Sequence, residues 1–252
     1  WTHRAANGTD IYFVSNQKDS ARTIHLSLRV SGRIPEIWNP VTAETFLAKT
    51  WQIKNGRTEL PVSLDQNASL FIVLQQSTKL TASSSGKNWK EIKQLQTIDG
   101  SWKVQFNPSL GGPKEAVTFN SLTDWTQHAD SAIRYYSGTA VYSKTFNYHG
   151  QKGKSVWLNI GTVNNLAQVF VNGKNCGVAW TAPYRVDISK AVKEGKNTLQ
   201  IEVVNTWNNR LVGDSHLPKE KRITYTAYPF KMEDKPLLPA GLLGSVVIEV
   251  AQ

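Results

Sequence analysis

The sequence of 252 residues contains a single cysteine, Cys176, so no disulfide can form within the chain. It also lacks an apolar run of about 18 residues, the length at which a membrane-spanning helix becomes a candidate. We therefore expect no membrane partner and a stability that comes from hydrophobic packing. The cysteine count does not decide the compartment, because a chain with a sufficient core needs no disulfide.

Recognisable metal, nucleophile and phosphate-binding motifs are absent as well. The five histidines show no paired spacing of the kind that binds zinc, and no G-x-S-x-G turn occurs. The glycines of GLLGS and SLGGP do not match a phosphate-binding fingerprint. We expect no cofactor and no metal site. A structural Ca²⁺ stays open as an alternative, although its roughly six to eight oxygen ligands cannot be assembled from the sequence.

A dense basic segment is missing too, although the net charge is +10, from 29 basic and 19 acidic residues. The nearest to one is KEKR, residues 219–222. Nucleic-acid-binding proteins usually concentrate their positive charge in a stripe on a recognisable module, so we expect no nucleic-acid partner. A diffuse positive surface favours an acidic polysaccharide instead, such as a pectic glycan.

The sequence does have a globular composition, with 40% hydrophobic residues, and repeated strand patterns. Residues 10–77 contain short alternating runs that are separated by turn residues. In TIHLSLRV, Ile24, Leu26, Leu28 and Val30 alternate with polar residues, as in a half-buried strand. Short strands with regular turns predict an all-β fold, with a small β-sandwich over residues 1–80.

Residues 81–95 interrupt the strand pattern. They include TASSSG, a composition typical of linkers, and we predict the domain boundary there. Residues 96–252 again show strand patterns and predict a second β domain. Residues 208–240 have no strong periodicity, which predicts a long loop that is functional or packed on a neighbour.

The stretch LAQVFVNGKNCGVAW, residues 166–180, predicts a β-hairpin. Asn172 and Gly173 form the dipeptide that is favoured where a two-residue turn needs positive φ. The following KAVKEGKN is long enough for one helical turn, with Asp187 or Ser189 as its N-terminal cap. TLQIEVVN then alternates as another strand.

VFVNGKNCGVAWTAPYRVDISKAVKEGKNTLQIEVVNTW, residues 169–207, resembles the galactose-binding-like jelly roll of the family 2 β-galactosidases and their relatives. NTWNNRLVGDSHLP and PLLPAGLLGSVVIEV resemble the carboxy-terminal end of the family 106 α-L-rhamnosidases. HRAANGTDIYFVSNQ is similar to the exit from their catalytic barrel into the following β domain. Together these resemblances cover nearly the whole chain.

The resemblance implies the carboxy-terminal region of such a glycoside hydrolase, with a small β-sandwich followed by a galactose-binding-like jelly roll. Its partners would be carbohydrate and the catalytic barrel of the parent chain. We expect a bacterial enzyme that acts on plant-type polysaccharide in the periplasm or outside the cell. The chain begins at Trp1 and shows no signal peptide, so we expect a processed product or a fragment.

Glycoside hydrolysis normally requires two carboxylates that face each other across the sugar, roughly 5–10 Å apart. The acidic candidates are Asp124, Glu202, Glu233 and Asp234. None lies in a barrel-strand context, and the resemblance transfers no catalytic residue to this chain, so we expect none. His128, with Asp124 and Asp130, is a candidate polar cluster.

Two short stretches have side chains suited to sugar binding. Aromatic rings can pack on the C–H faces of sugars, while amide and guanidinium groups bond to hydroxyls. We predict that these side chains gather at one edge of the jelly roll and contact glycan; they are Trp180, Tyr184, Trp207, Asn208, Asn209 and Arg210. The alternative is that the rings fill the end of the sandwich or pack on an adjoining domain.

Three classes of function follow from these patterns. The first is a non-catalytic accessory segment of a glycoside hydrolase, which supports the barrel and contacts glycan. The second is an autonomous carbohydrate-binding module, which would bind oligosaccharide without the barrel. The third is a small complete glycosidase, which would hydrolyse substrate on its own.

Overall fold

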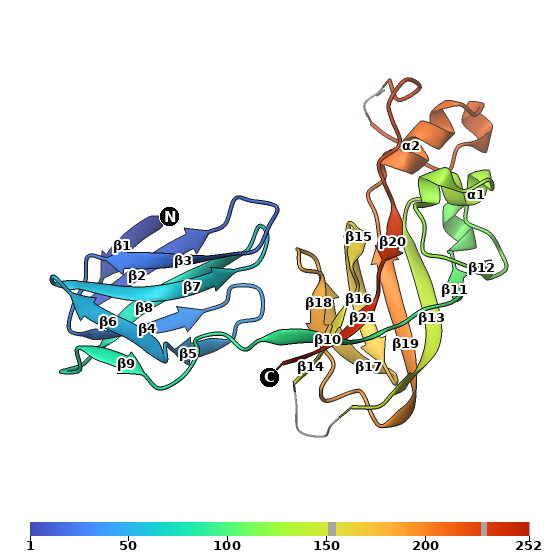
Figure 1. Ribbon diagram of the computed structural model, residues 1–252. Coiled ribbons are helices and arrows are strands. Elements are labelled where there is room, and N and C mark those ends of the chain that lie inside the picture. Colours follow the sequence, from blue (N-terminus) through green and yellow to red (C-terminus); the bar gives the residue numbers. More distant parts are fainter. Residues whose placement is uncertain (151–154, 228–230, 252) are drawn as a thin grey trace. The chain divides into compact units, whose positions relative to one another are not determined.

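The computed structural model describes residues 1–150, 155–227 and 231–251. The chain divides into two compact units, residues 1–91 and 92–252, and Figure 1 shows that both consist mainly of strands. The predicted class is confirmed, a small β-sandwich followed by a galactose-binding-like jelly-roll sandwich. The division between the units falls within residues 81–95, where β9 (Ala82–Ser84) belongs to the first unit and β10 (Ile92–Thr97) to the second.

The first unit is a sandwich of two antiparallel sheets. One sheet has the strand order β1-β2-β8-β4-β5 and the other β3-β7-β6-β9. The strands are β1 (Thr2–Ala6), β2 (Thr9–Ser15), β3 (Arg22–Leu28), β4 (Arg33–Trp38), β5 (Thr45–Leu47), β6 (Thr50–Lys54), β7 (Arg57–Leu64) and β8 (Ser69–Ser77). Ile37 and Ile72 from one sheet and Leu60 and Val62 from the other share a single buried cluster. The two sheets therefore pack face to face.

The second unit is also a sandwich, with a four-stranded sheet, β10-β21-β14-β18, and a six-stranded sheet, β12-β11-β13-β19-β16-β17. A two-stranded ribbon, β15-β20, completes it. The strands not yet given are β11 (Trp102–Gln105), β12 (Val117–Phe119), β13 (Thr139–Tyr148), β14 (Val156–Asn159), β15 (Thr162–Asn164), β16 (Leu166–Val171), β17 (Lys174–Ala179), β18 (Arg185–Asp187), β19 (Gly195–Val204), β20 (Gly241–Gly244) and β21 (Val247–Ala251).

Short helical segments accompany the second sandwich. They are α1 (Ser131–Arg134), α2 (Asn208–Ser215) and the 3-10 turns η1 (Pro108–Leu110), η2 (Trp125–Gln127) and η3 (Lys219–Lys221). Figure 1 shows α1 and α2 at the same end of this unit. The loop predicted over residues 208–240 is therefore wrong in its first part, where α2 forms.

The core of the second unit is rich in aromatic rings that are joined by hydrogen bonds. Tyr142 of β13 is fully buried, and its hydroxyl accepts hydrogen bonds from Trp125 Nε1 at 2.6 Å and from the backbone N of Leu242 at 3.3 Å. Burial raises the pKa of Tyr142 to about 12. A buried hydroxyl that meets two donors avoids the cost of an unsatisfied polar group.

The predicted hairpin between β16 and β17 is present, and the single turn predicted in KAVKEGKN forms as well, with Asp187 Oδ1 accepting from the backbone N of Ser189 at 2.8 Å. Asn172 (φ 52°) and Gly173 (φ 75°) both adopt the positive φ that a two-residue hairpin turn requires. In KAVKEGKN the backbone N–H groups of Ala191 and Val192 both bond to the carbonyl of Ile188, and no helix continues from this turn. The chain instead enters β19 at Gly195.

Among the residues that the structure describes, no helix is long and apolar enough to cross a membrane. Across the same residues, no group of three or more His, Cys, Asp or Glu side chains is placed to hold a metal ion.

We predict that Tyr142→Phe lowers the free energy of unfolding by roughly 1–3 kcal/mol at neutral pH, because two buried donors lose their acceptor. The pH dependence follows from the raised pKa. A tyrosine whose folded pKa lies above its unfolded value of 10.0 stabilises the fold below pH 10, and this stability is lost as pH rises toward about 12.

Urea unfolding near neutral pH and in the alkaline range measures both effects. The unmutated chain should lose more stability at high pH than Tyr142→Phe, while the exposed Tyr225→Phe serves as control. Identical alkaline slopes for the unmutated chain and Tyr142→Phe would contradict the buried-hydroxyl account.

Candidate functional site

The strand register brings the two predicted aromatic stretches to one end of the six-stranded sheet. Ala179, the last residue of β17, pairs with Ala167 of β16, and Ala167 pairs with Val203 of β19. Trp180 and Trp207 therefore follow β17 and β19, which end at the same side of the sheet with β16 between them. Two strand spacings correspond to about 10 Å between the strand ends. We call Trp180, Tyr184, Trp207 and Asn208 the aromatic rim.

Two rings of the aromatic rim face solvent. Trp180 is 57% exposed and Trp207 is 51% exposed, although large apolar side chains are usually buried. Trp207 is the N-cap residue directly before α2, so the helix fixes the position of its backbone. Asn208 is half-buried, and its amide donates to the carbonyl of Pro236 at 3.2 Å.

Tyr184 is half-buried and packs against the core of the sandwich. Its carbonyl accepts a hydrogen bond from the backbone N of Ile160 at 2.9 Å. The next residue, Arg185, forms an ion pair with Glu249, with 2.6 Å between Nε and Oε2. Tyr184 is therefore the most firmly positioned ring of the rim and offers a smaller surface to a ligand.

Asn209 and Arg210 have a different position from the one predicted, because both are buried, at 2% and 7% exposure. The Asn209 side chain donates to the carbonyl of Leu238 at 2.7 Å and accepts from its backbone N at 2.8 Å. Arg210 Nη2 lies 2.9 Å from Asp214 Oδ1, one helical turn further along α2. Asn209 thus binds the loop before β20 and Arg210 binds its own helix, so the prediction that these two side chains are offered to glycan is wrong.

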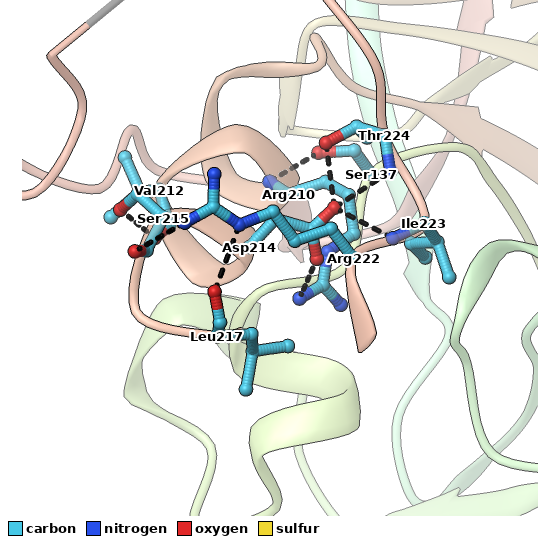
Figure 2. Close-up of polar contacts among 9 residues, drawn as sticks. All are labelled: Ser137, Arg210, Val212, Asp214, Ser215, Leu217, Arg222, Ile223 and Thr224. Carbon is cyan, nitrogen blue, oxygen red and sulfur yellow. Dashed lines mark hydrogen bonds and ion pairs between the residues drawn. The ribbon is translucent and has the colours of Figure 1, made fainter. Parts of the chain in front are cut away.

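Asp214 is the centre of this buried polar cluster, which Figure 2 shows in close-up. Its Oδ2 accepts hydrogen bonds from the backbone N of Ile223 at 3.0 Å and from the backbone N and Oγ1 of Thr224 at 2.7 and 2.6 Å. The backbone N of Arg210 donates to Ser137 Oγ at 3.0 Å. The Arg210–Asp214 pair therefore ties α2 to the segment that follows it and to the loop before β13.

Asp214 was absent from the predicted set, although the sequence contains a signal for it. Arg210 and Asp214 are four residues apart, the spacing at which opposite charges meet on a helix. The spacing could not be interpreted as a helical ion pair, because the sequence pattern predicts no helix over NNRLVGDS. Burial then makes the loss of one partner costly, because it would leave the other charge unpaired and withdrawn from water.

The predicted acidic candidates form no pair across a cavity. Asp124 accepts from the backbone N of Thr126 and of Ala240, at 2.9 and 3.0 Å, and so caps η2. Asp130 caps α1 by accepting from the backbone N of Ala132. Glu202 Oε1 accepts from Gln200 Nε2 at 2.8 Å, on the outer face of the sheet.

His128 and Cys176 both lie in local structural surroundings rather than in a reactive cluster. His128 Nδ1 accepts from the backbone N of Asp130 at 3.1 Å, and its ring stacks on Phe119 with 5.6 Å between ring centres. Burial raises the pKa of the Cys176 thiol, which disfavours the reactive thiolate. Glu233 and Asp234 lie in the irregular segment before β20.

Two family models match this chain. Residues 120–232 match the model described as glycosyl hydrolase 2 galactose-binding domain-like. Residues 1–50 match the model described as alpha-L-rhamnosidase, family 106. Both resemblances drawn from the sequence are thereby confirmed.

Individual relatives agree with these models. The chain is similar over 98% of its length to a solved rhamnosidase from Novosphingobium sp. PP1Y, with 38% identity and a TM-score of 0.87, and it spans 23% of that chain. A Formosa agariphila protein named "Putative beta-glucuronidase" is 32% identical over 88% of this chain, which spans 22% of that protein. A "Beta-glucuronidase" from the same organism is 29% identical over 51% of this chain and 14% of its own length.

We predict that Asp214→Ala lowers the free energy of unfolding by about 3–5 kcal/mol, because it leaves the buried Arg210 charge without its partner. The segment after α2 should also loosen, so trypsin should cut faster at Lys219, Lys221 and Arg222. Glu220→Ala is the matched control, since it removes an exposed carboxylate from the same segment.

Urea denaturation and the rate of tryptic cleavage measure the two effects. Equal unfolding midpoints and equal cleavage rates for Asp214→Ala and Glu220→Ala would show that the buried pair does not hold this segment.

Proposed function

We propose that this chain, which is related to the family 106 α-L-rhamnosidases and contains a family 2-type galactose-binding-like domain, is the non-catalytic carboxy-terminal part of a bacterial glycoside hydrolase. In this role it supports the catalytic barrel of its parent chain and contacts glycan through the aromatic rim. The main support for the proposal is the extent of the similarity. Nearly the whole chain is similar to a rhamnosidase, but it spans only 23% of that protein. The rest of such an enzyme leaves ample length for a catalytic barrel.

The positions of the carboxylates support a non-catalytic role. A glycosidase places one carboxylic acid and one carboxylate on opposite sides of the scissile bond. In this chain Asp124 and Asp130 are occupied by backbone N–H groups, and Glu202 lies on an open sheet face. Each contact is typical of a capping or surface acid rather than of a catalytic pair.

The exposed rings of the rim support contact with a sugar. An indole ring offers a flat apolar face together with one N–H donor, which suits a ligand that has both C–H faces and hydroxyls. Trp180 and Trp207 follow strand ends about 10 Å apart, a spacing that one oligosaccharide can span, and Asn208 adds an amide next to Trp207. Their backbones belong to strand ends and to a helix start, so little order has to be gained on binding.

We further propose that the natural substrate is a plant-type polysaccharide with acidic units, such as a pectic chain. The net charge of +10 favours an anionic polymer over a neutral one. The charge is spread along the chain, which suits a long ligand better than a compact one. This attraction weakens with salt, because the screening length falls to about 8 Å at physiological ionic strength.

The same substrate class leads us to propose a periplasmic or extracellular location. A polysaccharide of this kind is met outside the cytoplasm. Fractionation of the cells that make the parent protein tests this point, and recovery in the cytoplasmic fraction alone would refute it.

An autonomous carbohydrate-binding module is the second candidate, favoured by the exposure of Trp180 and Trp207. It differs from an accessory segment in one measurable way, since it binds oligosaccharide with full affinity when the barrel is absent. A small complete glycosidase is the third candidate and differs in requiring catalysis by this chain alone.

We predict that the purified chain does not hydrolyse aryl α-L-rhamnosides, β-glucuronides or β-galactosides, because its described carboxylates form no facing pair. Release of the aryl group is followed by absorbance while circular dichroism confirms a β fold. Turnover that copurifies with the folded chain and disappears in Asp124→Asn would instead support the complete glycosidase.

We predict that Trp180→Ala and Trp207→Ala each weaken oligosaccharide binding about tenfold, equivalent to about 1.4 kcal/mol, through the loss of one stacking surface. Calorimetry with neutral rhamnose-containing oligosaccharides measures the change. Trp38→Ala is the control, because Trp38 is an exposed tryptophan of the first unit. An unchanged affinity in both rim variants would remove the rim from the proposed function.

A further inference from the structure

A recess at the edge of the six-stranded sheet lies outside the aromatic rim. It is a shallow, open depression with a volume of about 490 Å³. Its lining comes from β11, β12 and β13 and from the segment that leads into β11. No residue of the rim belongs to it.

Strand register places three of the lining side chains in one row. Lys103 of β11 pairs with Thr118 of β12 on one side and with Ser143 of β13 on the other, and all three are exposed. The Cβ atoms of directly opposed residues are about 4.5–5.5 Å apart. One ligand can therefore meet an ammonium and two hydroxyls together. Thr145, two residues along β13 on the same face, adds a third hydroxyl.

Lys144 belongs to the opposite, inward face of β13, and its surroundings hold its ammonium group at the end of β11. Its Nζ donates to the carbonyl of Ser101 at 2.9 Å and lies 5.2 Å from the centre of the Trp102 ring. Trp102 is only 2% exposed, so this ring is a fixed support. Gly100, with φ +88°, leaves the necessary space, because a Cβ there would lie 3.3 Å from Lys144 Nζ.

The charges around the recess favour an anion. The Asp99 carboxylate acts on Lys144, so these two charges offset each other, and Lys103 is left as the excess positive charge among these lining residues. Burial lowers the pKa of Lys144, while the Asp99 carboxylate acts in the opposite direction. The hydroxyls of the row can donate or accept, so they suit the hydroxyls of a sugar ring.

We propose that this recess binds the acid group of an anionic saccharide unit, with Lys103 facing the carboxylate or sulfate and the hydroxyl row bonding to the sugar ring. The inference rests on the proposed function and gives its acidic substrate a location. The recess is distinct from the rim: Ser143 lies four residues along β13 from Thr139, which pairs with Val204 at the rim end, a separation of about 14 Å. The two sites can therefore be tested independently.

The first test compares three probes by calorimetry on the whole 252-residue chain at low ionic strength. The probes are a galacturonic acid oligosaccharide, its carboxyl-reduced neutral form and a sulfated galactose oligosaccharide. We expect at least one anionic probe to bind about tenfold or more tightly than the neutral form. The preferred probe identifies the acid group as carboxylate or sulfate. Equal affinity for all three overturns the proposal.

The second test separates the recess from the general positive charge. Lys103→Gln should weaken binding of the anionic probe about five- to tenfold, whereas Lys103→Arg, which keeps the charge, should retain most of it. Lys196→Gln is the matched control, because Lys196 is an exposed lysine of β19 in the same sheet and its replacement changes the net charge equally. Equal losses in Lys103→Gln and Lys196→Gln overturn the proposal.

Lys103 carries this test because its side chain is exposed and its replacement leaves the core intact, whereas Lys144 supports neighbouring backbone. Thermal unfolding checks that each variant keeps the fold. A loss of anion preference in Lys103→Gln with unchanged binding of the neutral probe supports the recess separately from the rim. If the unmutated chain shows no anion preference while Trp180→Ala and Trp207→Ala still weaken neutral binding, only the recess is refuted.

Discussion

The pairing of β13 with β19 is the constraint on which the second unit depends. Both strands are ten residues long and stay in register throughout, with Thr139 opposite Val204 at one end. Because side chains alternate along a strand, this register directs Tyr142 and Ile201 into the core and Ser143 out to solvent. A slip by one residue would exchange the two faces, so core packing opposes it strongly. The same register places the strand ends at the rim and the hydroxyl row at the recess.

Where β19 ends, a buried ion pair decides the path of the chain. An eight-residue helix such as α2 is marginal by itself in water, so its contacts must maintain it. Arg210 and Asp214 supply these contacts, and Asn209 holds the loop before β20 in the same way. Withdrawing two charges from water is costly, and the hydrogen bonds at Asp214 Oδ2 offset part of that cost. The pair therefore fixes one conformation at the rim end of the sandwich.

The surface chemistry of the second unit is divided between places that the fold keeps apart. Flat rings, Trp180 and Trp207, are exposed at the strand ends, while Lys103 and the hydroxyl row lie further along the sheet. Asp124 and Asp130 are used as caps within the chain. This division is the one expected of the non-catalytic, glycan-contacting role that we propose.

The sequence by itself determined the strands, the hairpin turn and the class of fold. Alternation at Leu26 and Leu28 and the Asn172–Gly173 turn are local patterns. They can be recognised without knowing which strand pairs with which. It also placed Trp180 and Trp207 at strand ends. Only the tertiary structure decided that Asn209 and Arg210 point inward and that α2 forms. Helices this short are decided by contacts with distant residues, and the row from Thr118 to Ser143 exists only through strand register, so neither can be read from neighbours along the chain.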